Sequence, residues 1–416
     1  MNKLRFLVSG FFKEKIFCGL DIGSQKIKAA LSRVQDATTL DLLAVNEVET
    51  RGLNNGSVDD LAAFSSAVGS ALDGLTKKTK IRFRDVYLGV GGALVDTRMS
   101  RALIPVTERG NKIIVPHDVK NARWQARLLG VRLEEEVLSD FVRQFKVDDI
   151  NIALNPVGLY GRKIEVETLL AVVNMARLRN ITKAIRQAGY EVNRTFFSGE
   201  ALSIAVLDTH HRQEGCVLVD IGAGKTAIYI FKDGLLKYFT SVLFGGERMT
   251  ERVARALNVP TALAEDVKRS YVRLSEPSGK AANDEILIKK DQGLVPVKRA
   301  DLNQAVSEEA RTLIDEIRQA IVASGYDGQL KAGAVVAGGG ALLTGLMEMM
   351  EAELKMPVVM ARNIQGLNNA SLYAVSTSLA EAGYKGSLRY VFDTRKPKDW
   401  FDAFRSKIQE LCNEYF

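Results

Sequence analysis

The most constraining feature of the sequence is a short pattern that occurs once in each half of the chain. Residues 19–31 read GLDIGSQKIKAAL, and residues 218–230 read LVDIGAGKTAIYI. Both place Asp-Ile-Gly after an apolar run and a lysine three residues beyond the glycine. Alternating or β-rich sequence continues after each turn, which predicts a strand–turn–strand hairpin. Two such hairpins predict a duplicated α/β fold whose halves face each other across a cleft.

The strand that follows each turn separates these motifs from other phosphate-binding loops. A Walker-type loop or a dinucleotide-binding fingerprint leads from a strand into a helix. Neither copy in this sequence predicts a helix at that point. A single Asp-Ile-Gly turn is most often a plain tight hairpin, whereas two copies in matched positions favour a shared phosphate site.

The turn residues have the chemistry that a nucleoside triphosphate needs. Glycine lets backbone N–H groups approach phosphate oxygens closely, and aspartates at strand ends can hold Mg²⁺ through its water shell. We therefore predict that ATP and Mg²⁺ bind between the hairpins. The expected metal-site residues are Asp21 and Asp220. The expected phosphate-side residues are Gly23, Ser24, Gln25 and Lys26 in the first turn, and Gly222, Ala223, Gly224, Lys225 and Thr226 in the second.

A third glycine cluster lies at residues 334–346, AVVAGGGALLTGL. The first residues predict a buried strand, and residues 342–354 predict a helix with apolar residues at helical spacing. Gly338, Gly339 and Gly340 form the predicted turn between them, followed by Ala341. Such a turn suits a purine and ribose lying on exposed backbone. Many strand–helix units use glycine turns, so this cluster gains weight mainly as the third element in order.

Residues 245–271 add two further candidate contacts. Gly245 and Gly246 are interpreted as a hinge-like turn on the phosphate side. A predicted helix over residues 262–271 carries Glu265 and Lys268 three residues apart, on one face. This pair is expected either to grip the ribose and adenine edge or to form an exposed ion pair worth a few tenths of a kcal/mol.

Composition narrows the class of protein. A chain of 416 residues is too long to fold around a single hydrophobic core, so its length predicts at least two domains. Its three cysteines, Cys18, Cys216 and Cys412, lie far apart and build neither a disulfide framework nor a metal cage. The formal charge of +7 favours an anionic partner only weakly. No dense basic stripe with interleaved aromatic residues is present, so nucleic acid is not expected.

The order of these elements resembles the actin, heat-shock chaperone and sugar kinase superfamily, and several stretches resemble the FtsA family of bacterial cell-division proteins. NPVGLYGRKIEVETLLAVV at residues 155–173 is the most specific, and RDVYLGVGGALVDTRMSRALIPV at 84–106 and RGLNNGSVDDL at 51–61 support it. The resemblance implies an actin-like two-domain fold of duplicated ribonuclease-H-like domains with a small inserted subdomain. The implied bounds are 1–83 and 161–197 for the first domain, 84–160 for the insert, 198–250 and 331–390 for the second domain, and 251–330 for its small subdomain.

The same resemblance implies a function. Members of the family bind ATP, form filaments and bind the tubulin-like division protein FtsZ, here expected through residues 251–330. The second phosphate turn departs from the family pattern, because Ala223, Lys225 and Ala227 stand where a glycine, a threonine or similar residue, and an aspartate are usual. Lys225 is expected either to replace part of the metal's charge or to point to solvent.

Glu200 matches the position of a water-orienting acid in the chaperone branch of the superfamily. It is interpreted as a candidate catalytic residue or as a helix N-terminal acid after Ser198. With one carboxylate lost at position 227, we expect tight ATP binding and at most slow hydrolysis.

The C-terminal sequence changes character after the second domain. Residues 391–398 are interpreted as a linker, and residues 399–416 predict a helix with one apolar face. That face is formed by Trp400, Phe401, Phe404, Ile408, Leu411 and Tyr415. Such a face can dock on the protein core or form a coiled-coil seam, but its aromatic residues and the resemblance favour a membrane surface. Residues 1–15 are interpreted as a simple lead-in or as a second, weaker membrane contact.

These observations predict a cell-division protein that polymerises, binds ATP and tethers FtsZ filaments to the cytoplasmic face of the inner membrane. It would contact itself, the lipid surface and other division proteins. A PilM-type pilus-assembly protein and a small-molecule kinase of the same superfamily remain the alternatives.

Overall fold

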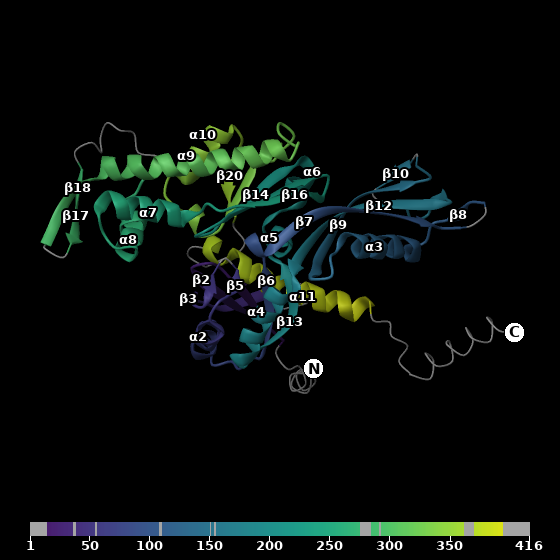
Figure 1. The fold of residues 1–416 in the computed structure, drawn as a ribbon, viewed down its shortest axis with the longest axis horizontal. Coiled ribbons are helices and arrows are strands. Elements are labelled where there is room, and N and C mark those ends of the chain that lie inside the picture. The colour runs from purple at the N-terminus through teal and green to yellow at the C-terminus, as the bar shows by residue number, and fades with distance from the viewer. Residues whose placement is uncertain are drawn as a thin grey trace, which may run out of the picture.

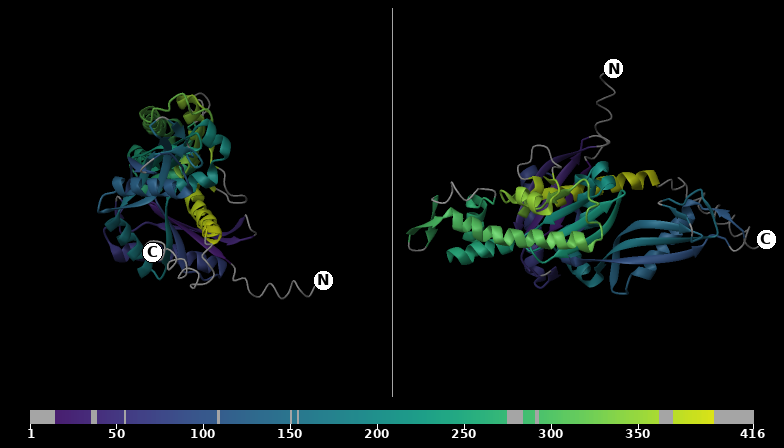
Figure 2. Two further views of the ribbon diagram at one scale, coloured as in Figure 1. Left: turned by 90° about the vertical axis from the view of Figure 1, so that its right-hand side faces the viewer. Right: turned by 90° about the horizontal axis from the view of Figure 1, so that it is seen from above.

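The structure is a computed structural model that describes residues 15–35, 39–54, 56–107, 110–149, 151–153, 155–274, 284–290, 293–361 and 370–393. The molecule is elongated, with two sheet-containing halves in the middle (Figures 1 and 2). One end of the long axis is formed by an inserted subdomain, and the other by a helical subdomain that ends in a small hairpin. The two halves therefore meet near the centre of the molecule.

The first half is built on a five-stranded sheet with the order β13-β6-β1-β2-β3. The strands are β1 (Ile16–Ile22), β2 (Lys26–Val34), β3 (Leu40–Glu49), β6 (Asp85–Val90) and β13 (Glu191–Phe197). The first three form an antiparallel meander, while β6 runs parallel to β1 and β13 parallel to β6. The sheet packs against α2 (Leu61–Thr79), α4 (Met175–Gln187) and α11 (Ala374–Asp393). A short ribbon of β4 (Leu53–Asn54) and β5 (Ser57–Val58) precedes α2.

The second half repeats this arrangement. Its sheet has the order β16-β15-β14-β19-β20, with an antiparallel meander of three strands followed by two parallel strands. The strands are β14 (Cys216–Ile221), β15 (Thr226–Lys232), β16 (Leu235–Val242), β19 (Ala334–Ala337) and β20 (Val358–Met360). Its helical elements are α5 (Ser198–Val206), α6 (Thr209–Glu214), η2 (Gly340–Leu342), α10 (Leu346–Leu354) and η3 (Ala370–Tyr373). The matching strand orders confirm the predicted duplication.

The hydrophobic cores join the halves. The strand β14 is buried on both faces, as expected for a central strand with cover on each side. One face of the second sheet contributes to the core of the first half. There the centroid of the Phe197 ring lies 5.8 Å from that of Tyr229 and 5.2 Å from that of Phe239. The other face packs on α10 and the helical subdomain. This shared packing positions the two Asp-Ile-Gly hairpins against each other.

The inserted subdomain is a four-stranded sheet with its own small core. It comprises η1 (Gly92–Leu94), β7 (Val95–Pro105), β8 (Lys112–Ile113), α3 (Pro116–Gly130), β9 (Glu135–Val147), β10 (Asn151–Ala153), β11 (Tyr160–Gly161) and β12 (Lys163–Asn174). The expected bounds of 84–160 need correction. Because β6 pairs with β1 and β13 in the first sheet, the insert begins after Val90, and β12 pairs with β9 as far as Asn174.

The helical subdomain of the second half contains α7 (Gly246–Leu257), α8 (Thr261–Tyr271), β17 (Glu285–Lys290), β18 (Gly293–Lys298) and α9 (Arg299–Ala323). Its buried residues form one continuous core with the adjacent face of the second sheet. Near the third glycine cluster, the helix expected over 342–354 begins only at Leu346. The delay arises because Gly340–Leu342 form a 3₁₀ turn and Gly345 takes a left-handed conformation at φ +86°.

Candidate functional site

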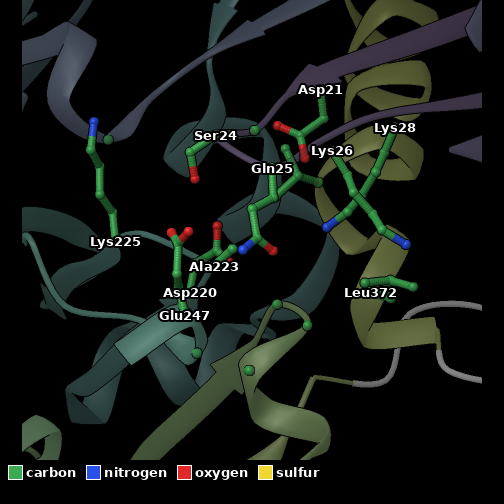
Figure 3. A pocket seen from close by; sticks show the side chains of 18 of the residues that line it. Asp21, Ser24, Gln25, Lys26, Lys28, Asp220, Ala223, Lys225, Glu247 and Leu372 are labelled. Carbon is green, nitrogen blue, oxygen red and sulfur yellow. The ribbon is translucent and has the colours of Figure 1, made fainter. Parts of the chain in front are cut away.

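A cavity of about 450 Å³ lies between the two halves, lined by both Asp-Ile-Gly turns and by the third glycine cluster. Figure 3 shows the side chains around it. Fifteen of the sequence-predicted residues line the cavity: Asp21, Gly23, Ser24, Gln25, Lys26, Asp220, Gly222, Ala223, Lys225, Gly246, Glu265, Lys268, Gly338, Gly339 and Gly340. Segments far apart in the sequence are thus brought to one site by the duplicated fold.

The two turns have the same local structure. The Gly23 N–H donates to the Lys26 carbonyl at 3.1 Å, and the Gly222 N–H donates to the Lys225 carbonyl at 2.9 Å. The turns also touch, because the Gly224 N–H donates to the Ser24 hydroxyl oxygen at 3.3 Å. A ligand bound here would therefore contact equivalent backbone from both halves.

Two aspartates face the cavity, one from each half. Burial raises the pKa of Asp21, with Lys28 opposing the shift. Burial and then the charge of Asp21 raise the pKa of Asp220 to about 6, again with Lys28 opposing. A bound cation would relieve the repulsion between the carboxylates, so the pair suits Mg²⁺. In the described part of the chain, no group of three or more His, Cys, Asp or Glu side chains gathers that could hold a metal ion.

Gly245 and Gly246 support the second turn. The N–H groups of Gly246 and Glu247 donate to the carbonyls of Gly222 and Ala223 at 3.0 and 2.8 Å. A Cβ at position 245 would lie 2.6 Å from the Gly222 carbonyl oxygen and closer still to that of Ala223. These N–H groups at the start of α7 are therefore committed to the second turn and hold it in place.

Glu265 and Lys268 form part of a buried network rather than an exposed ion pair. Lys268 is only 8% exposed, and its amine donates to the Gly246 carbonyl at 3.0 Å and the Thr250 hydroxyl at 2.7 Å. It lies 2.6 Å from the Glu265 carboxylate, which also pairs with Arg269 at 2.7 Å. Burial chiefly lowers the pKa of Lys268, and Glu265 opposes this shift. The network joins α7 to α8 and presents its edge to the cavity.

The third glycine turn packs directly on the end of β14. Gly338 has a φ of +90°, and a Cβ there would lie 2.5 Å from the Asp220 Oδ1 atom. Its carbonyl accepts a hydrogen bond from the Ser371 hydroxyl, and its N–H donates to the Ser371 carbonyl, both at 3.2 Å. The Leu372 side chain covers Gly339, so a flat ligand on this turn would meet an apolar neighbour.

Five residues that were predicted for ATP binding or catalysis do not line the cavity: Gly224, Thr226, Gly245, Ala341 and Glu200. Thr226 is fully buried, and its hydroxyl donates to the Phe244 carbonyl at 2.7 Å. The Glu200 carboxylate accepts a hydrogen bond from Ser139 on β9 of the insert. Glu200 also lies in the first turn of α5, in agreement with the helix N-terminal interpretation.

Several residues line the cavity that the sequence analysis did not predict as site residues. Lys28, Ser198, Glu247, Arg269, Ser371 and Leu372 all border the cavity. The two-residue period of a strand could have identified Lys28, because it shares a face of β2 with Lys26. Glu247 directly follows the glycine pair. Ser371 and Leu372 lie in a 3₁₀ turn with no motif, so only the fold brings them here.

Comparison with known proteins agrees with this architecture. The family model for "Cell division protein FtsA" matches residues 217–379, and that for "SHS2 domain inserted in FTSA" matches residues 92–172. The cell-division protein FtsA of Escherichia coli K12 is 28% identical over 80% of this chain and 80% of its own length. FtsA of Streptococcus pneumoniae is 26% identical over 82% of this chain and 74% of its own length. FtsA of Buchnera aphidicola is 24% identical over 96% of this chain and 97% of its own length.

Solved structures share the fold at lower sequence identity. A PilM–PilN type IV pilus biogenesis complex contains a chain with a TM-score of 0.64 and 18% identity, covering 88% of this chain and 98% of that one. The structure of MreB5 of Spiroplasma citri bound to ADP has a TM-score of 0.54 and 12% identity, and the match covers 91% of this chain and 99% of that one. The predicted actin-like fold is thereby confirmed. The two matching models and the relatives together show that this chain belongs to the FtsA family of cell-division proteins.

Proposed function

We propose that the chain binds ATP in the cavity between its halves. The paired turns, the glycine turn beside Asp220 and the Glu265–Lys268 network support the proposal, because they place glycine-rich backbone, a surface for a flat base and charged side chains around one space. MreB5, which shares the fold, has been solved with ADP and with AMPPNP. Mg²⁺ would be held by Asp21 and Asp220 through water and would neutralise phosphate charge.

We further propose that ATP binding serves assembly. In this proposal the chain polymerises, binds FtsZ through residues 251–330 and acts as an adaptor of the division machinery, with ATP hydrolysis slow at most. Family membership supports it. The placement of Glu200 against Ser139 of the insert also suits a binding protein better than a fast ATPase, because it keeps this carboxylate off the cavity.

The same proposal places the protein at the cytoplasmic face of the inner membrane, held by residues 399–416. These residues lie outside the described part of the structure, as does the linker from residue 394, so the support comes from their sequence. No helix among the described residues is long and apolar enough to cross a membrane. Burial of an apolar face at the lipid surface gives modest affinity for one copy, and polymerisation would raise it by about 10²–10⁴-fold.

Two measurements test this function. Isothermal titration calorimetry with ATP and Mg²⁺ is expected to give one site per chain, and absence of binding would refute the nucleotide site. Co-sedimentation with vesicles containing anionic lipid is expected for the full chain and lost on deletion of residues 399–416. If the truncated chain sediments equally well, the proposed membrane role of the tail is wrong.

A PilM-type function is the second candidate, because the PilM-containing complex shares the fold over 88% of this chain. The match of residues 92–172 to the insert of FtsA favours the first proposal. A small-molecule kinase receives no comparable support. Binding of purified FtsZ filaments to the full chain, compared with binding of a PilN-type peptide, separates the two candidates.

A further inference from the structure

Two segments of the first half carry an excess of positive charge. Residues 73–85 form the end of α2 and its connection to β6, and residues 175–194 form α4 and the beginning of β13. Together they contain ten lysines and arginines but only three acidic residues, which gives a net charge of +7. This equals the formal charge of the whole chain, so the charges of the remaining residues balance. The positive charge of the protein is therefore concentrated in these two segments.

The two segments meet at one end of the first sheet. The strands β6 and β13 run parallel, with their first residues, Asp85 and Glu191, side by side. Just before these strands, the centroids of the Phe83 and Tyr190 rings lie 5.5 Å apart. Residues that follow β6 and β13 line the cavity, so the segments meet at the opposite end of the sheet. Figure 1 shows α2 and β13 on the side of the first half that faces away from the second half.

Several cations at this end have no counter-charge. The acidic residues nearby are already engaged, because Asp73 accepts a hydrogen bond from the Tyr190 hydroxyl at 2.7 Å and Glu191 pairs with Arg84 at 2.8 Å. Five exposed side chains form no hydrogen bond or ion pair with any residue that the structure describes, and we call them the basic face: Lys77, Lys80, Arg82, Lys183 and Arg186.

The chemistry of this face fits the headgroups of an anionic bilayer. A protein interface usually has an apolar centre, but none of the large exposed apolar side chains in the described chain belongs to either segment. Single-stranded nucleic acid binds to exposed aromatic rings, whereas Phe83 and Tyr190 pack against each other. A surface of long cationic side chains without apolar or aromatic anchors suits lipid phosphates best.

The proposed membrane tail continues from the same end of the first half. Helix α11 begins beside the cavity and reaches the start of β1, where the centroids of the Tyr384 and Phe17 rings lie 5.5 Å apart. Further along α11, a Cβ at Gly386 would lie 3.2 Å from the Arg194 guanidinium on β13. Residues 399–416 contain four acidic residues and two cations. Their net charge is negative, so attraction to anionic lipid has to come from other residues.

We propose that the basic face is a second membrane contact, which binds the headgroups of anionic phospholipids while residues 399–416 insert into the same leaflet. The proposal rests on the proposed membrane location. Each cation held near an anionic leaflet strengthens attachment by about fivefold. Two contacts on one body also fix its orientation, with the first half toward the lipid and the second half away from it.

Vesicle co-sedimentation with the full chain tests this role. The vesicles contain phosphatidylcholine alone or phosphatidylcholine with phosphatidylglycerol, and the basic-face variant combines Lys80→Gln, Arg82→Gln and Arg186→Gln. This variant is expected to bind the phosphatidylglycerol vesicles on the order of tenfold to a hundredfold more weakly than the native chain, and the neutral vesicles equally well. Its binding is also expected to depend less on salt, because salt screens exposed charges.

A control variant removes the same charge elsewhere by combining Lys120→Gln, Lys331→Gln and Lys355→Gln. These lysines are exposed in the insert and the second half, and their amines have no partner among the described residues. Lys355 matches Lys80, because both end a helix in the left-handed conformation, at φ +55° and +62°. The control is expected to bind phosphatidylglycerol vesicles like the native chain.

The outcomes separate this proposal from the proposed function. If both variants bind phosphatidylglycerol vesicles equally well, the basic face is refuted while the role of the tail stands. If the native chain binds no vesicles, the proposed membrane location fails, and the basic face with it. If the basic-face variant keeps its vesicle binding but no longer co-sediments with purified FtsZ filaments, the face serves an acidic protein and the proposal is wrong. Thermal unfolding checks the fold, and Lys80→Gln with Arg82→Gln replaces the triple variant if that variant is unstable.

Discussion

Replacing Gly338 by alanine tests whether the third glycine turn must pack on Asp220. The new Cβ would lie 2.5 Å from the Asp220 Oδ1 atom and nearer still to the Ile221 carbonyl oxygen. The backbone at this position also has a φ of +90°, which disfavours any side chain. The substitution therefore combines backbone strain with a direct clash against the end of β14.

The magnitude follows from the two effects. A left-handed backbone costs a residue with a side chain about 1–2 kcal/mol. Overpacking against fixed backbone adds about 1–3 kcal/mol, so Gly338→Ala is expected to destabilise the protein by about 2–5 kcal/mol in all. Gly189 is a matched control, since its φ is also +90° but a Cβ there would meet nothing within 4 Å. Gly189→Ala is expected to show only the first cost.

Urea unfolding followed by circular dichroism measures the stability, and calorimetry measures ATP affinity. Gly338→Ala is expected to unfold at lower urea than Gly189→Ala and to bind ATP at least about tenfold more weakly, because relief of the clash moves the Asp220 carboxylate or the glycine turn. Equal stability of the two variants, with equal ATP affinity, would refute the reasoning.

Two shorter predictions concern residues at the turns. Asp21→Ala is expected to weaken binding of ATP with Mg²⁺, and polymerisation with it, while the thermal unfolding temperature stays near native; unchanged affinity by calorimetry would exclude Asp21 from the site. Thr226→Val leaves the buried Phe244 carbonyl without its hydroxyl partner and is expected to cost about 1–3 kcal/mol in urea unfolding. Its ATP affinity is expected to stay native, and a tenfold loss without destabilisation would show that Thr226 contacts the ligand directly.

Local sequence patterns were sufficient to predict the elements that carry the site. Each Asp-Ile-Gly hairpin follows from an apolar strand, a glycine turn and a second β-rich strand, all within about a dozen residues. Their recurrence predicted the duplication that the two strand orders confirm. The bounds of the insert were less accurate, because the pairing of β6 with β1 and β13 is a long-range contact that no local pattern encodes.

What each side chain does at the site was decided by the tertiary structure. Three residues belong to segments predicted to face the ligand but are engaged elsewhere. The Thr226 hydroxyl bonds to the Phe244 carbonyl, Gly245 packs on the second turn, and the Glu200 carboxylate accepts a hydrogen bond from Ser139. The sequence by itself determined which segments form hairpins and turns, since these depend on near neighbours. Only the packing of the two halves decided which of their side chains reach the shared cavity, because that depends on partners hundreds of residues away.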